Sequence, residues 1–294
     1  MFCSSVAGIP QALTPFTINH LDDVLGAMMD LLIQIANVIE GAFRKIESCI
    51  EPPVFIESDH GNVFRFQEES IEAAVVQKCA RLTSGLNASI VLLSSGYTQE
   101  LGALFRMLDE FNEDINFLCQ AIRKGEISEL HKKYLDDFYQ EEFDKPGNAL
   151  LSTQKRETIP RRKIHAALSK VPEQELNPSD NKEVHRTISQ AYSGYVHAAS
   201  THVMDMYGGN PPRFCVSGML GTPRIDEFTI NAWDYFYRGL LAIMMVALTF
   251  KEHDLLKELY GFRDYVEITS GNTEWEHPEV LVKRSKAKNK SDSG

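Results

Sequence analysis

EESIEAAVVQKCARLTSGLNASIVLLSSG (68–96) and TQELGALFRMLDEFNEDINFLCQAIRKG (98–125) are two stretches whose apolar residues recur at the three- and four-residue spacing of an α-helix. Ser94-Ser95-Gly96 is a typical end for the first helix, and Gly125 follows the second. Because the connection between them is short, the two helices are expected to lie antiparallel as an αα-hairpin. The sequence around this pair predicts further helices of the same kind.

Helical patterns continue on both sides of this pair. We expect helices at about residues 19–51, 128–143, 161–169, 181–207 and 225–259, the first capped by Asn19 and ended by Pro52. Between the first two helices, β-prone residues flank Asp59-His60-Gly61-Asn62, which predicts a β-hairpin over residues 54–66 with His60 in its turn. The fold class is therefore predicted to be mainly α: an up-and-down helical bundle of about six or seven helices with one small β-hairpin insertion.

The domain organisation follows from where these patterns begin and end. No long linker rich in Pro, Gly or Ser divides the chain of 294 residues. We expect an N-terminal lead over residues 1–18, a single helical-bundle domain over residues 19–278, and a basic tail over residues 279–294. The tail contains KRSKAKNKSDSG, whose one apolar residue is an alanine, and this composition predicts disorder.

The formal net charge of −11 disfavours nucleic acid and anionic membranes as partners at long range, so either would need a local basic patch. One candidate for RNA binding is the middle segment, which carries Lys155, Arg156, Arg161, Arg162 and Lys163. A solvated surface cluster explains the same charges, and the segment lacks the aromatic residues that stack on single-stranded bases.

Compartment and cofactors are predicted mainly from absent patterns. The five cysteines are scattered without a CxxC pair, and the sequence has no glycine-rich nucleotide motif, HExxH or GxSxG. We therefore predict no cofactor and no metal site. The N-terminus has no signal-peptide pattern, and the most apolar run, residues 239–250, is shorter than the ~20 residues that cross a bilayer. These features predict a cytoplasmic protein without a membrane partner.

Three side chains are candidates for a catalytic site. Arg106 and Glu110 are four residues apart on one face of a helix whose neighbours are apolar, so the pair is expected to point partly inward. Far along the chain, YSGYVHAASTHVMD (192–205) carries His197. If both segments meet, Arg106 would stabilise a phosphate charge, His197 would transfer a proton and Glu110 would orient one of them. An internal ion pair that fixes helix packing is the structural alternative.

These segments also carry a family resemblance. Over roughly residues 70 to 260 the chain resembles a family of bacterial all-helical proteins of unknown function, and the residues that match are Gly96, Tyr97, Arg106, Glu110, Tyr192, Ser193, Tyr195, Val196 and His197. That family is similar in outline to the HEPN and abortive-infection group, in which some members cleave RNA with an Arg-x-x-x-x-His motif. The present sequence departs from that motif, because no histidine follows an arginine at that spacing.

Two functions follow as hypotheses. The first is a helical interaction or regulatory protein that binds a protein partner or forms a homo-oligomer. The family resemblance implies that such a protein would act in bacterial phage defence. Trp233, Tyr235, Phe236 and Tyr237 run around a helix, so part of this aromatic cluster is expected to contact another chain or a loop, although core packing is the alternative. The second hypothesis, which the resemblance implies, is a HEPN-like ribonuclease with Arg106, Glu110 and His197 as its site.

Overall fold

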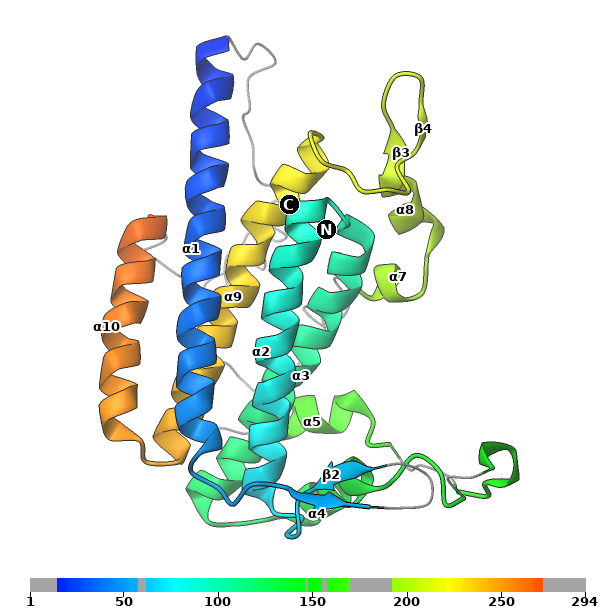
Figure 1. Ribbon diagram of the computed structural model, residues 1–294, viewed down its shortest axis with the longest axis vertical. Coiled ribbons are helices and arrows are strands. Elements are labelled where there is room, and N and C mark those ends of the chain that lie inside the picture. The colour runs from blue at the N-terminus through cyan, green and yellow to red at the C-terminus, as the bar shows by residue number, and fades with distance from the viewer. Residues whose placement is uncertain (1–14, 58–61, 146–147, 155–157, 170–191, 272–294) are drawn as a thin grey trace, which may run out of the picture.

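A computed structural model describes residues 15–57, 62–145, 148–154, 158–169 and 192–271, with the side chains of residues 15–22 left aside. The predicted fold class is confirmed, since the chain is mainly α and its β-structure is limited to two small antiparallel sheets in the described ranges. Four long helices form the bundle in Figure 1, and they are α1 (Pro15–Glu47), α2 (Ile71–Ser95), α3 (Thr98–Lys124) and α9 (Pro223–Thr249). A fifth, α10 (His253–Ser270), packs outside against α1 and α9.

The core lies where α1, α2, α3 and α9 meet. The apolar residues of each helix recur on one side, and those sides are almost fully removed from water, as at Leu32, Ile39, Leu86, Phe105 and Phe236. The aromatic cluster of residues 233–237 belongs to this core: Trp233, Tyr235, Phe236 and Tyr237 are all buried, which is the core-packing alternative. At ~25 cal/mol per Å² of buried apolar surface, this shared interior is the main stabilising contribution to the fold.

The predicted αα-hairpin is confirmed, and its ends are the expected ones. The side chain of Ser70 accepts a hydrogen bond from the backbone N–H of Ala73 and so caps the start of α2. Gly96 ends α2 at φ 75°, a backbone conformation that glycine adopts without a steric penalty. A Cβ at this position would also lie 2.7 Å from the backbone nitrogen of Met219, so the turn is closely covered by a later loop.

The β-hairpin predicted at residues 54–66 is present as β1 (Val54–Ile56) and β2 (Val63–Arg65), with Phe55 opposite Phe64. His60, predicted for its turn, lies outside the described residues. A second two-stranded sheet was not predicted from the sequence. It pairs β3 (Tyr207–Gly208) with β4 (Arg213–Phe214), and we call these strands with their turn the β3–β4 arm.

Several predicted helix boundaries were wrong. α1 begins at Pro15 rather than Asn19, because proline is accepted in a first helical turn. α4 spans Glu129–Tyr139 and stops before residue 143, while α5 (Arg161–Leu168) lies where a short helix was expected. The predicted helix 225–259 is two helices, since Lys251 turns the chain at φ 63° between α9 and α10. The predicted tail begins beyond the last described residue.

The described part of the predicted helix 181–207 consists of single turns. These are α7 (Ser193–Val196), α8 (Ser200–Val203) and the 3₁₀ turn η2 (Met204–Met206), and a second 3₁₀ turn, η1 (Ala149–Leu151), follows α4. Ala198, at φ 48°, separates α7 from α8. The remainder of that prediction lies outside the described residues.

Among the residues that the structure describes, one helix is long and apolar enough to cross a membrane. It is the part of α1 from Asp23 to Glu47, which has a mean hydropathy of 1.4 over its most apolar window. The prediction of no membrane span was based on residues 239–250 and did not take this segment into account. Length and composition alone do not separate a membrane span from a core helix, and the second half of α1 supplies core residues such as Ile35 and Ile46.

Candidate functional site

Arg106 and Glu110 form the ion pair expected from their spacing on α3. Nη2 of Arg106 lies 2.7 Å from Oε1 of Glu110, and the arginine side chain is more buried than its partner. Nη1 of Arg106 is buried without a hydrogen-bond partner among the described residues. The guanidinium charge is therefore neutralised by Glu110, and one of its nitrogens is unused within this part of the chain.

His197 lies at the end of a short helix that packs against α3, the helix of this pair. It follows α7 directly, and its side chain is exposed. α7 meets α3 through other residues: the Tyr192 ring packs edge-on against Phe105 at 5.6 Å between centroids, and the Tyr195 ring covers Gly102 so closely that a Cβ there would lie 2.7 Å from its Cγ. No hydrogen bond or ion pair joins His197 to Arg106 or Glu110 in the described ranges.

The five basic candidates of the middle segment have different surroundings. Lys155 and Arg156 lie outside the described residues. Arg162 and Lys163 are exposed in the first turn of α5. Arg161 points inward instead: it donates to Glu113, to Asp114 at 2.5 Å and to the backbone carbonyl of Glu110 at 3.2 Å. Although burial opposes it, the two carboxylates raise the pKa of Arg161.

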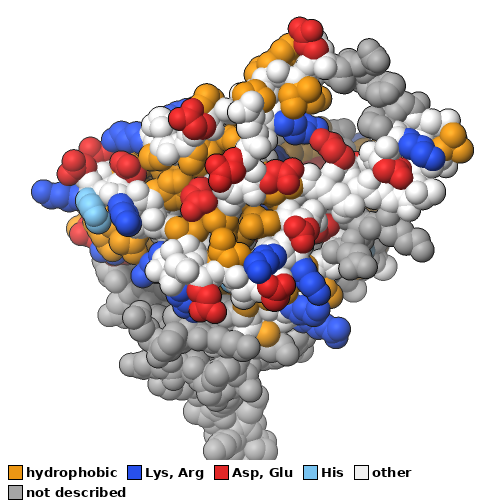
Figure 2. All heavy atoms as spheres, turned by 90° about the horizontal axis from the view of Figure 1, so that it is seen from below, with side chains coloured by type: hydrophobic (Ala, Val, Ile, Leu, Met, Phe, Trp, Pro, Cys, Tyr) orange, Lys and Arg blue, Asp and Glu red, His pale blue; other side chains and the backbone are white. Residues whose placement is uncertain are grey.

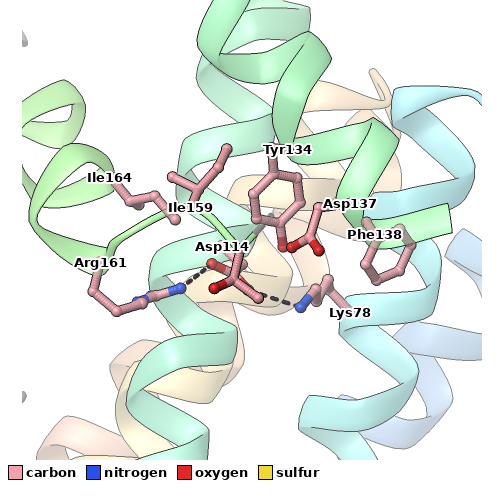
Figure 3. A pocket seen from close by; sticks show the side chains of 9 residues that line it. Lys78, Asp114, Tyr134, Asp137, Phe138, Ile159, Arg161 and Ile164 are labelled. Atoms are coloured by element: carbon pink, nitrogen blue, oxygen red, sulfur yellow. Dashed lines mark hydrogen bonds and ion pairs between the residues drawn. The ribbon is translucent and has the colours of Figure 1, made fainter. Parts of the chain in front are cut away.

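These contacts belong to a charged network that joins α2, α3 and α5. Asp114 accepts from Arg161 through one carboxylate oxygen and from Lys78 through the other, at 2.7 Å (Figure 3). Next to it, Nε2 of the buried His165 lies 3.0 Å from the carboxylate of Glu113. Both carboxylates are thus matched with basic groups, as buried charges require. The network fixes α5 against α3.

A small pocket opens beside this network. It has a volume of about 140 Å³ and is lined by charged, aromatic and aliphatic side chains (Figure 3), namely Lys78, Asp114, Tyr134, Asp137, Phe138, Thr158, Ile159, Arg161 and Ile164. The ammonium of Lys78 lies 5.1 Å from the centre of the Phe138 ring, within cation–π distance. Burial, reinforced by Asp114, raises the pKa of the Tyr134 phenol, so this hydroxyl stays neutral at physiological pH.

A second network joins α3 to α9. Nη1 of Arg238 lies 2.7 Å from Oδ1 of Asp109, and the guanidinium also stacks over the Tyr235 ring at 4.5 Å from its centre. Burial raises the pKa of Asp109 to about 6 even though Arg238 counteracts the shift. A third network holds the segment before the β3–β4 arm, because Asp205 accepts from Tyr195 at 2.8 Å and from Arg224 at 2.5 Å.

Most of these partners are not predictable from the sequence. Asp109, Glu113 and Asp114 lie between apolar residues of α3, a pattern that indicates buried charges, but their partners on α5 and α9 are remote in sequence. Within the described ranges, His, Cys, Asp and Glu side chains form no group of three that could hold a metal ion. The arrangement is able to fix helices to one another through matched charges.

Comparison with known proteins adds no assignment. No family model matches the chain, and no curated protein or solved structure was found to be similar to it.

Proposed function

We propose that this chain is a cytoplasmic interaction protein that binds an apolar, basic segment of a protein partner through its β1–β2 hairpin. The observation that supports this proposal is the exposure of apolar side chains on both faces of the hairpin. The rings of Phe55 and Phe64 contact each other at 5.2 Å between centroids on one face, yet they remain 50% and 62% exposed. On the other face Ile56 and Val63 are exposed as well.

A two-stranded hairpin of this size has little stability of its own, and it normally packs its apolar face against something. Here the hairpin is tied to the segment after α4 by an ion pair, in which Nε of Arg65 lies 2.6 Å from Glu141. The segment after α4 also exposes apolar residues, and Leu150 is 96% exposed. We define the hairpin surface as Phe55, Ile56, Val63 and Phe64.

Acidic side chains surround this surface, and they indicate the charge of the partner. Exposed carboxylates precede, follow and flank the hairpin, whereas Arg65 is the basic residue within it and is already paired. Figure 2, which views this end of the bundle from below, shows exposed hydrophobic side chains among acidic and basic ones. A partner segment with lysines or arginines beside its apolar residues would match both features. The acidic residues are Glu51, Glu57, Glu68, Glu69, Glu141, Glu142 and Asp144.

The mode of binding follows from the strands. Each strand of a two-stranded sheet has one unpaired edge, and an extended peptide adds to such an edge through backbone hydrogen bonds while its side chains fit the exposed face. A suitable probe is a synthetic peptide of alternating phenylalanine and threonine with two lysines at each end. The control peptide has glutamates in place of the lysines.

The lysine peptide should bind the purified protein in a calorimetric titration, and its affinity should fall as salt is raised because the acidic side chains are exposed. The glutamate peptide should not bind. Equal binding of both peptides, or of neither, would refute the proposed partner chemistry.

The role in bacterial phage defence that the family resemblance implies is kept as part of this proposal. Phage challenge of a host with and without the gene tests it, and unchanged plaque numbers would reject it. The HEPN-like ribonuclease with Arg106, Glu110 and His197 is the alternative hypothesis. It has less support, because Glu110 neutralises Arg106 and no described contact links His197 to either.

A further inference from the structure

The end of the bundle away from the β1–β2 hairpin carries two projections. In Figure 1 the first part of α1 rises above the other long helices, and the β3–β4 arm rises at the same end. We call the described residues 23–30 of α1 the α1 overhang.

The α1 overhang is apolar, and its base touches the core, where the partly buried Met28 and Met29 pack against it. Every core residue of α1 lies further along the helix, from Leu31 onward, and no residue from 23 to 30 is buried. Yet Val24 and Leu25 continue the helical spacing of Met28 and the core residue Leu32. The apolar stripe of α1 thus extends beyond the surface that its own bundle provides.

The β3–β4 arm is also apolar and exposed. The rings of Tyr207 and Phe214 pack edge-on at 4.9 Å between centroids, and the two residues are 45% and 46% exposed. The loop that follows leaves Val216 and Leu220 exposed too. This end therefore has two separate projections that carry exposed apolar side chains.

The charges of the two projections are opposite. The α1 overhang carries the exposed Asp23 and Asp30, and the sequence has no lysine or arginine before Arg44. The arm and its following loop, residues 207–222, carry Arg213 as their charged residue, and it is exposed. In a two-fold symmetric dimer the overhang of each copy would lie on the arm of the other. The acidic overhang would then contact the basic arm at two equivalent places.

We propose that two copies of this chain associate through this end, with the α1 overhang of each packed against the β3–β4 arm of the other. The apolar side chains of Val24 and Leu25 would cover Tyr207 and Phe214 of the second copy, and Arg213 would face Asp23 and Asp30. The arm of a second copy fits the α1 overhang better than the hairpin surface does. The hairpin surface is surrounded by acidic groups, which would repel Asp23 and Asp30 of the overhang.

Charge reversal tests the pairing. Sedimentation of the full chain at a series of concentrations should show a monomer–dimer equilibrium. Arg213→Asp should raise the dimer dissociation constant at least about tenfold, and adding Asp23→Arg and Asp30→Arg to it should restore the constant to within about threefold. Lys133→Asp, an equal charge change at an exposed position of α4, is the control and should leave it unchanged.

Four outcomes would overturn the inference: a monomer at every concentration, a dimer insensitive to Arg213→Asp, a failure of the triple variant to recover, or an equal effect of the control. The other partner that an apolar helix could bind is a lipid surface, and flotation with phosphatidylcholine vesicles tests for it. If the protein floats with vesicles and the variants do not alter its self-association, α1 binds lipid and the dimer is rejected. The peptide titrations of the hairpin surface are unaffected by either result.

Discussion

The guanidinium of Arg238, on α9, lies 2.7 Å from the carboxylate of Asp109, on α3, in the interior of the bundle. An arginine cannot lose its charge inside a protein, so its partner must remain near it or the charge is left unpaired. Asp109→Leu should therefore lower the free energy of unfolding by about 3–5 kcal/mol. Urea denaturation followed by circular dichroism measures this loss.

The double variant Asp109→Leu with Arg238→Met is the matched test of the same pair. Because it removes both charges, it should be more stable than Asp109→Leu alone. If the loss of stability in the double variant equals the sum of the losses in Asp109→Leu and Arg238→Met alone, the two side chains do not act as a pair.

The same carboxylate makes stability depend on pH. Its pKa in the folded state is raised from 3.8 to about 6, chiefly by burial, so the folded protein holds a proton that the unfolded chain releases between these values. Stability from this group is present below about pH 4 and is lost as the pH rises through 6, with a total of about 3 kcal/mol. The charged or titratable groups around the Asp109 carboxylate are Arg238, Arg106, Glu113 and Tyr235.

Asp109→Asn isolates this contribution, because the amide cannot ionise. The stability of the natural protein minus that of Asp109→Asn should decline between pH 4 and pH 7. A difference that stays constant over this range would mean that Asp109 titrates at its ordinary pKa.

Arg161 should hold α5 in place, since it donates to both Glu113 and Asp114 on α3. Arg161→Met should cost about 2 kcal/mol of unfolding free energy and should speed amide hydrogen exchange in α5. Arg162→Met is the control. Because the side chain of Arg162 is exposed, this substitution should change the free energy of unfolding by less than about 0.5 kcal/mol. Equal effects of both substitutions would assign the role of Arg161 to another contact.

The composite nuclease site gives a prediction of its own. Because no described contact joins the exposed His197 to Arg106, His197→Ala should leave any cleavage of mixed RNA by the purified protein unchanged. Gel analysis of the RNA after equal incubations measures it. Cleavage that disappears in His197→Ala and in Arg106→Ala would restore the ribonuclease hypothesis.

How far the sequence predicts this protein depends on whether a signal is local. The αα-hairpin could be predicted because Ser70, Gly96 and the spacing of apolar residues act within a few positions. The arrangement around His197 could not, since Ala198 adopts a left-handed backbone conformation that its residue type does not indicate. The partners of Arg161 and Arg238 are set by helix packing between segments remote in sequence, which no local pattern contains.

The claim that the hairpin surface binds a partner depends on Phe55 and Phe64. Phe55→Ser with Phe64→Ser should weaken the lysine peptide at least about tenfold in a calorimetric titration, while Tyr207→Ser with Phe214→Ser, the equivalent exposed pair of the β3–β4 arm, should bind it as the natural protein does. Both variants change exposed side chains, and unchanged circular dichroism confirms their fold. Undiminished binding by the first variant, or an equal loss in the second, would contradict the proposed function.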